Sequence, residues 1–100
     1  MIIKLSKPYE FEGKKITELT LDFEALSGRD IIAVETEASS IAGRPVLDID
    51  KTYQACLAAK AAGVVYDLIL GLPAKDFIRV IGPAQNFLLD ISVQEIQPIQ

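Results

Sequence analysis

The stretch KPYEFEGKKITELTLDFEALSGRD, residues 7–30, decides the fold of this chain. Its first part places Tyr9 and Phe11 in alternation just before Gly13, and glycine readily adopts the positive φ that a tight turn requires. Pro8 cannot donate a ladder hydrogen bond, so it marks the start or the edge of a strand. These features predict that the chain opens with an antiparallel β-hairpin.

The second strand of the hairpin is predicted over residues 16–23. Leu19, Leu21 and Phe23 alternate with polar residues, so they share one face of the strand, and we expect that face to be buried. Ile16 falls on the other face, where it lies at a β-bulge or against a neighbouring element.

A helix follows the second strand. Ser27 and Asp30 have the spacing of a capping box at its N-terminus. An apolar stripe with helical spacing carries the helix to about Ser40, and its members are Ile31, Val34, Ala38 and Ile41. The connector that comes next is predicted to contain a short extended piece over residues 46–49.

A long helix is predicted over residues 51–70, with Asp48 or Asp50 as its cap. Its apolar residues recur at steps of four and three and pass Gly63 without losing phase: Tyr53, Leu57, Ala61, Val64, Leu68 and Leu72. A second interpretation ends the helix at Gly63 and makes residues 64–70 a buried strand, because its first two residues are β-branched.

The tripeptide Gly71-Leu72-Pro73 separates this helix from the last one. Gly71 suits the C-terminal end of a helix, and Pro73 suits the first turn of the next. The last helix presents four apolar residues on one face: Phe77, Ile81, Ala84 and Leu88. Pro83 removes a backbone donor inside it, so we expect a kink or a short break near Gly82.

Together these elements predict an α+β fold, in which an N-terminal antiparallel β-hairpin or small sheet is followed by about three α-helices. One hundred residues make a single domain, which we place at residues 1–90. Residues 91–100 then form a C-terminal tail. This tail either lacks a fixed structure or adds a strand that completes a sheet or docks on a neighbour.

The composition argues against catalysis. The chain has no histidine and one cysteine, Cys56, which removes the commonest general base and the usual metal ligands. Cys56 lies among alanines on a helical stripe and is predicted to be a buried structural thiol. Helix capping and solvent exposure explain Asp48, Asp50, Asp67 and Asp76. We therefore expect no enzyme, cofactor or metal site, and a carboxylate-only enzyme is the weaker alternative.

Charge and hydropathy point toward a protein partner. The net charge is −4 without a basic stripe, so we expect no nucleic-acid binding. No signal segment and no run of about 18 apolar residues is present, so we expect no membrane contact and an intracellular location. Half of the residues are hydrophobic and the mean hydropathy is +0.29, which favours self-association or an apolar groove for a partner. The candidate protein-binding residues are Tyr9, Phe11, Phe77, Phe87, Leu88 and Leu89.

The order of these features resembles that of small phage tail assembly chaperones of contractile-tailed phages and prophages. The resemblance covers roughly residues 3–90. It rests on Leu5, Lys7-Pro8, Gly13-Lys14, the strand TELTL at 17–21, Gly28-Arg29-Asp30, Gly71-Leu72-Pro73 and Asp76. The positions that carry the family pattern are Pro8, Gly13, Leu19, Leu21, Asp30, Gly71, Leu72, Pro73 and Asp76.

This resemblance implies a non-enzymatic protein that forms homo-oligomers and acts in the cytoplasm of a bacterial host during phage or prophage assembly. Such a protein binds the tape measure protein, a long and largely helical chain, keeps it soluble, and helps to recruit the tail-tube protein. The alternative from a different class is a structural subunit that stays in a phage tail or tail-like particle.

Overall fold

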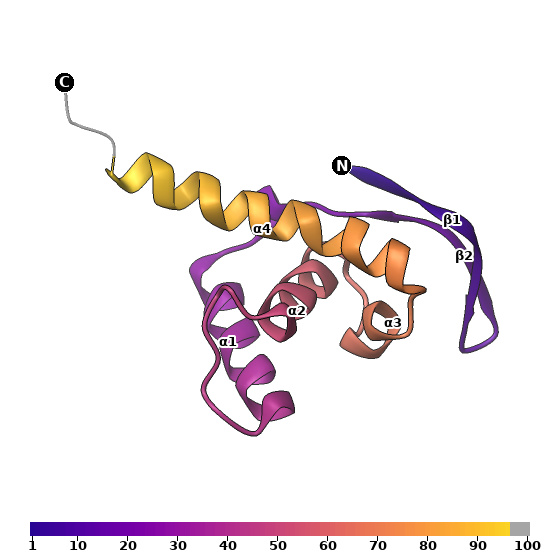
Figure 1. Cartoon of the computed structure of the whole chain (residues 1–100), viewed down its shortest axis with the longest axis horizontal. Helices are drawn as coiled ribbons and strands as arrows, with labels where there is room; N and C mark the ends of the chain where they lie inside the picture. The colour runs from indigo at the N-terminus through magenta and orange to yellow at the C-terminus, as the bar shows by residue number, and fades with distance from the viewer. Residues whose placement is uncertain (97–100) are drawn as a thin grey trace.

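A computed structural model describes the backbone of residues 1–96 and the side chains of residues 1–90. A two-stranded antiparallel sheet precedes one 3₁₀ turn and the helices (Figure 1). The elements are β1 (Ile2–Phe11), β2 (Lys14–Thr20), η1 (Phe23–Ala25), α1 (Gly28–Ala42), α2 (Lys51–Ala62), α3 (Tyr66–Leu70) and α4 (Ala74–Ile96). The predicted α+β fold is confirmed, with four α-helices in the described part of the chain where about three were expected.

The hairpin turn has the geometry that its sequence predicts. Glu12 and Gly13 both have positive φ values, 49° and 79°, and such a turn matches the twist of the two strands. The pairing register shifts between Lys4, which faces Glu18, and Tyr9, which faces Ile16. Residues 5–8 of β1 therefore bulge opposite the single residue Thr17 of β2.

The bulge explains why Ile16 is out of phase with the rest of its strand. Ile16 follows the register shift, and it packs half-buried against the same core as the buried Leu19. A bulge increases the local twist of the paired strands, so a side chain beside it turns relative to its neighbours in the strand. The expectation that Ile16 lies at a bulge is confirmed.

The second strand ends at Thr20, before the predicted end at Phe23. The Asp22 amide donates to the Ala61 carbonyl oxygen at 3.0 Å, which satisfies an acceptor at the C-terminus of α2. Because Asp22 is bonded to α2, the chain turns away from the sheet after Thr20, and η1 begins at Phe23. The strand prediction is wrong for the last residues, whereas the predicted burial of Leu21 is confirmed at 1% exposure.

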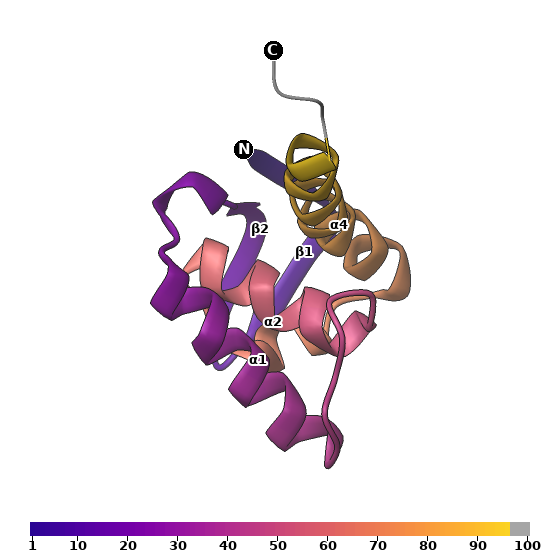
Figure 2. The same cartoon turned by 90° about the vertical axis from the view of Figure 1, so that its left-hand side faces the viewer.

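Helix α1 begins with the predicted capping box. The Ser27 amide donates to Asp30 Oδ2 at 2.8 Å, and the Asp30 amide donates to Ser27 Oγ at 3.4 Å. Val34 and Ala38 are buried, but Ile41 is exposed, so the predicted stripe is wrong at its last position. The end of α1 projects beyond α2, and Ile41 lies in this last turn (Figure 2).

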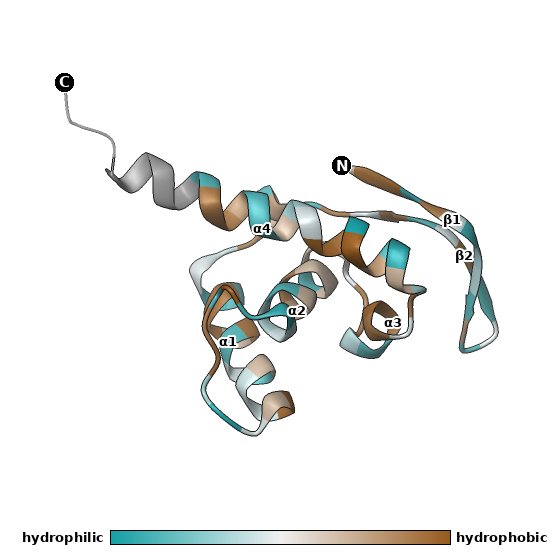
Figure 3. Cartoon of the chain, viewed as in Figure 1, coloured by the Kyte–Doolittle hydropathy of each residue, from teal (hydrophilic) through white to brown (hydrophobic). Residues whose placement is uncertain are grey.

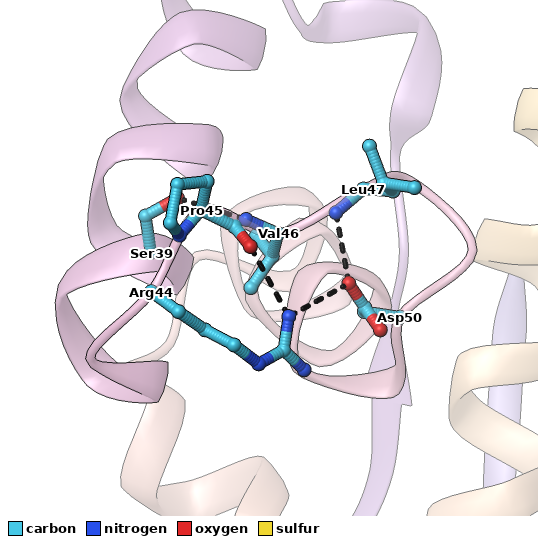
Figure 4. A network of polar contacts seen from close by, with 6 residues as sticks. All are labelled: Ser39, Arg44, Pro45, Val46, Leu47 and Asp50. Carbon is cyan, nitrogen blue, oxygen red and sulfur yellow. Dashed lines mark hydrogen bonds and ion pairs between the residues drawn. The ribbon is translucent and has the colours of Figure 1, made fainter.

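The connector between α1 and α2 is a network of polar contacts, and the extended piece predicted over residues 46–49 is wrong (Figure 4). Asp50 Oδ2 accepts a hydrogen bond from the Leu47 amide at 2.8 Å and lies 3.5 Å from Arg44 Nη1. The Leu47 amide and the Arg44 charge hold the pKa of Asp50 below its ordinary value. Asp50 occupies the N-cap position of α2, yet its side chain makes no cap bond there because it folds back on the connector.

Gly63 divides the helix that was predicted over residues 51–70. Its φ of 69° is left-handed, and the Val64 amide donates to the Ala59 carbonyl oxygen at 3.0 Å, as in a Schellman motif. The alternative strand over residues 64–70 is also wrong, because this segment contains the short helix α3. The apolar phase persists across Gly63 since α2 and α3 face the same core.

Helix α2 is buried on almost every side and lies between two groups of core residues. One group packs under the hairpin and includes Leu19, Leu21, Ala58, Leu68, Ile69, Leu72, Val80 and Ile81. The other packs under α1 and includes Val34, Ala38, Val46, Tyr53, Cys56, Leu57 and Ala84. Burial, together with the Glu37 charge, raises the pKa of Cys56 to about 12, so the thiol is protonated and structural, as predicted.

Helix α4 runs without interruption through Pro83, so the predicted break is wrong (Figure 1). The predicted face is confirmed: Ile81 and Ala84 are buried, and Phe77 and Leu88 pack half-buried against the two cores. The helix reaches Ile96, so the start of the predicted tail is helical rather than a strand. The remaining tail, residues 97–100, lies outside the described residues, and the division of the chain at residue 90 stays a prediction.

A buried carboxylate connects α4 to the bulge of β1. Asp76 is 0% exposed, and it accepts hydrogen bonds from the Ser6 amide at 3.0 Å and from Ser6 Oγ at 2.9 Å. Arg79 Nη1 lies 3.4 Å from Asp76 Oδ1. Burial opposes ionisation, but the Ser6 donors and the Arg79 charge outweigh it and hold the pKa of Asp76 below its ordinary value. The prediction that Asp76 is solvent-exposed is therefore wrong.

Leu21→Ala should lower the free energy of unfolding by about 2–5 kcal/mol, because it removes a buried side chain and leaves a cavity. Urea unfolding followed by circular dichroism measures the change. A loss close to zero would show that Leu21 does not pack in this core.

Asp76→Asn should lower the free energy of unfolding at neutral pH. The difference in this free energy between the variant and wild type should become smaller as the pH falls. An aspartate whose pKa is lowered on folding contributes stability above its unfolded pKa of about 3.9, and that contribution is lost as the pH falls through the folded pKa. Urea midpoints between pH 7 and pH 2.5 measure this. Asp67→Asn, at an exposed position on α3, is the control and should follow the wild-type curve. A difference that stays constant with pH would contradict the assignment.

Candidate protein-binding surface

Many large apolar side chains remain exposed in the described part of the chain. They include Met1, Ile2, Ile32, Ile41, Leu47, Ile49, Val65, Leu70, Ile78 and Leu89. The hydropathy colouring places such residues on the α1–α2 connector and along α4 (Figure 3). Where exposed apolar side chains of this size gather beside a groove, they are typical of a site for another protein.

The first groove lies between α4 and the segment that joins β2 to η1. It has a volume of about 470 Å³ and is lined by Met1, Leu21, Asp22, Phe23, Glu24, Pro83, Asn86, Phe87 and Asp90. The rings of Phe23 and Phe87 stack at a centroid distance of 5.2 Å and join its two sides. Its apolar floor is therefore built from residues that are distant in sequence.

The second groove lies between α4 and the α1–α2 connector. It has a volume of about 420 Å³ and is lined by Asp48, Ile49, Gln54, Gln85, Leu88 and Leu89. Ile49 is 75% exposed and Leu89 is 64% exposed, so both sides of this groove present an aliphatic side chain to solvent. The polar network around Asp50 fixes the connector that carries Ile49 (Figure 4).

A hydrogen-bonded amide pair, the buried Gln54 and the exposed Gln85, forms the base of the second groove. Gln85 Nε2 donates to Gln54 Oε1 at 2.8 Å, and Gln54 Nε2 donates to the Asp48 carbonyl oxygen at 3.2 Å. These two bonds connect α4, α2 and the connector. Because Gln54 is buried and hydrogen-bonded, it positions the walls of the groove rather than offering a free polar group.

The two grooves flank the same part of α4. Pro83, Phe87 and Asp90 face the first groove, whereas Gln85 and Leu89 face the second. Ala84 between them is buried toward the core. At 100° per residue these positions fall on opposite sides of one helix, so residues 83–90 form a ridge between the grooves.

The structure separates the candidate binding residues into two sets. Phe87 lines the first groove, and Leu88 and Leu89 line the second. Tyr9, Phe11 and Phe77 lie elsewhere, half-buried against the core under the hairpin. Tyr9 and Phe11 stack at 6.4 Å, and the Tyr9 hydroxyl donates to the Leu68 carbonyl oxygen at 3.1 Å.

The sequence did not predict most of the residues that line the two grooves, among them Met1, Phe23, Ile49 and Gln54. Phe23 was assigned to a buried strand face, and Ile49 to an extended connector. The sequence did carry a signal for Phe23 and Ile49. Each is a large apolar residue that stands alone among turn-forming and charged residues, so it has no core partner nearby in the sequence.

The positions that carry the family pattern mainly serve the fold. Leu19, Leu21 and Leu72 are core residues, and Gly13 makes the hairpin turn. Asp30 completes the capping box of α1, and Asp76 accepts the hydrogen bonds of Ser6 in the bulge that also contains Pro8. The Pro73 carbonyl accepts the first helical hydrogen bond of α4, from the Phe77 amide at 2.8 Å.

Gly71 leaves room for the Tyr9 side chain. It lies at the C-terminal end of α3, as predicted, with a φ of −81°, which is not left-handed. A Cβ atom at this position would lie 2.5 Å from the Tyr9 hydroxyl oxygen. Glycine therefore allows the hairpin to approach the end of α3 and lets Tyr9 reach Leu68.

Neither a metal cluster nor a membrane-spanning helix is found in the described residues. No group of three or more cysteine and acidic side chains there could hold a metal ion. No described helix is both long and apolar enough to cross a bilayer.

Two open apolar grooves on a small α+β body are typical of a protein-binding domain. The family model for "Phage tail assembly chaperone proteins, E, or 41 or 14" matches residues 2–89, and the chain belongs to this family. No curated protein and no solved structure matches the chain. Membership indicates a non-enzymatic role in which the protein interacts with tail proteins.

Gly71→Ala should destabilise wild type by roughly 1–3 kcal/mol, because the new methyl group collides with the Tyr9 hydroxyl. In a Tyr9→Phe background the same change should cost much less, since the colliding oxygen is gone. Urea unfolding of the two single variants and the double variant gives the coupling energy. Strictly additive effects would show that Gly71 and Tyr9 do not meet.

Proposed function

We propose that this protein binds the tape measure protein of a phage or prophage tail, keeps it soluble before assembly, and helps to recruit the tail-tube protein. The observation that supports this most is the pair of apolar grooves on either side of α4. A long helical chain exposes repeated apolar faces until it is packed in the tail. Many copies of a small protein with matching grooves would shield those faces by mass action.

The proposal includes self-association and a location in the cytoplasm of the bacterial host during assembly. Among the residues whose side chains the structure describes, ten large apolar ones are exposed, from Met1 to Leu89, and they supply more apolar surface than the two grooves use. Multiple copies bound along one tape measure chain would gain avidity through contacts with each other. Family membership supports the assembly-stage role.

Co-expression with the tape measure protein of the same phage or prophage tests the function directly. The tape measure protein should become soluble and be recovered in a pull-down with this chain, and light scattering of this chain alone should detect an oligomer. A monomer that neither binds nor solubilises the partner would contradict the proposal. The alternative, a structural tail subunit, predicts abundant copies in purified particles by mass spectrometry.

The double variant Ile49→Ser/Leu89→Ser should lower the recovery of soluble tape measure protein several-fold without changing the fold. Both side chains are exposed on the second groove, so their replacement removes binding surface and little core packing. The matched control is Ile32→Ser/Ile41→Ser, which removes two exposed aliphatic side chains from α1. Equal recovery with both double variants would exclude the second groove as a binding surface.

A further inference from the structure

The first groove differs from the second in its charge. Asp22 and Glu24 stand on one side of it and Asp90 on the other, around the apolar floor made by Leu21, Phe23 and Phe87. No lysine or arginine lines it among the described residues. The amino group of Met1 lies at its edge and already donates to the Leu21 carbonyl oxygen at 3.1 Å.

The carboxylates of Asp22 and Glu24 are available to a partner. Both residues are exposed, and neither side chain has a hydrogen bond or ion pair with another residue in the described part of the chain. The Asp22 amide is bonded to Ala61, which fixes the backbone that carries both carboxylates. The negative edge is thus held in place, and neither of these two carboxylates is paired within the described part of the chain.

The dimensions of the groove fit a helix that lies alongside α4. The α4 side of the groove runs from Pro83 to Asp90, and these two residues are about 10 Å apart along the helix axis. A docked helix has the same rise, so it would place apolar residues at i, i+3 or i+4, and i+7 against this length. Phe23 and Phe87 would contact the middle of that stripe.

We propose that the first groove binds an amphipathic helical segment that carries lysine or arginine on the flanks of its apolar stripe. The apolar residues contact the floor, and the basic residues meet Asp22 and Glu24 at the edge. This inference rests on the proposed function, because it specifies the chemistry of the tape measure segment that the protein binds. Charge complementarity at an edge favours the correct partner and speeds its association.

Two synthetic 18-residue helical peptides test the groove independently of the tape measure protein. Both have leucine at i, i+3, i+4 and i+7 spacing, and one has lysine and the other glutamate on the flanks of the stripe. Fluorescence anisotropy with the full chain should show tighter binding of the lysine peptide, weakened by salt as exposed charges are screened. Equal or tighter binding of the glutamate peptide would overturn the inference.

The variant Asp22→Lys/Glu24→Lys should bind the lysine peptide roughly 3- to 30-fold more weakly, since two attractive charge pairs become repulsive. The control is Glu35→Lys/Glu37→Lys, which makes the same change of net charge at exposed positions of α1. The control should retain wild-type affinity. Equal weakening in both variants would mean that only the overall charge matters, and would also overturn the inference.

The same variants in the co-expression assay separate this inference from the function that it rests on. If Asp22→Lys/Glu24→Lys loses the ability to solubilise the tape measure protein and the control variant does not, both the inference and the proposed function are supported. Full solubility with both variants overturns the inference and leaves the proposed function standing. If the wild-type protein does not solubilise the tape measure protein but binds the lysine peptide more tightly than the glutamate peptide, the proposed function is wrong and the inference about the groove stands. If only Asp22→Lys/Glu24→Lys abolishes self-association of the chain, the occupant is a second copy and the inference is wrong.

Discussion

The buried carboxylate of Asp76 is the contact on which the arrangement of this molecule depends. A two-stranded hairpin is at most marginally stable alone and must pack against something else. The bulge in β1 turns the Ser6 amide and hydroxyl toward α4, where both donate to Asp76. Asp76 also lies in the first turn of α4, where the helix dipole favours negative charge. One side chain thus joins the sheet to the longest helix and sets the direction in which that helix leaves the sheet.

The position of α4 in turn creates the candidate surface. Its Val80 and Ile81 pack under the hairpin, and Ala84 packs with the second core, so α4 spans both groups of core residues along one side of the molecule (Figure 1). The β2–η1 segment borders one side of the ridge at residues 83–90, and the α1–α2 connector borders the other. Because α4 lies between these two segments, one groove forms on each side of it, and the two grooves have similar volumes but different charges. The family assignment indicates that the protein interacts with tail proteins, and we propose the two grooves as the surface for that interaction.

Local patterns in the sequence predicted the elements that depend on local interactions. The hairpin turn at Gly13, the capping box of Ser27 and Asp30, and the buried faces of α1 and α4 all follow from residues close in sequence. The failures arose where a distant contact decides the outcome. Asp22 leaves the sheet because it bonds to Ala61, and Asp76 is buried because Ser6 approaches it from 70 residues away. The grooves could not be predicted for the same reason, since each combines segments that the sequence keeps far apart.

The measurement that tests the central claim most directly is hydrogen–deuterium exchange of the full chain with and without the tape measure protein. We expect slower exchange at residues 21–24, at the α1–α2 connector and at residues 83–90, because these segments border the two grooves. The hairpin turn around Gly13 and the outer face of α1 should remain unchanged. Protection confined to the hairpin turn or to α1, with no change along α4, would contradict the conclusion that the two sides of this helix form the binding surface.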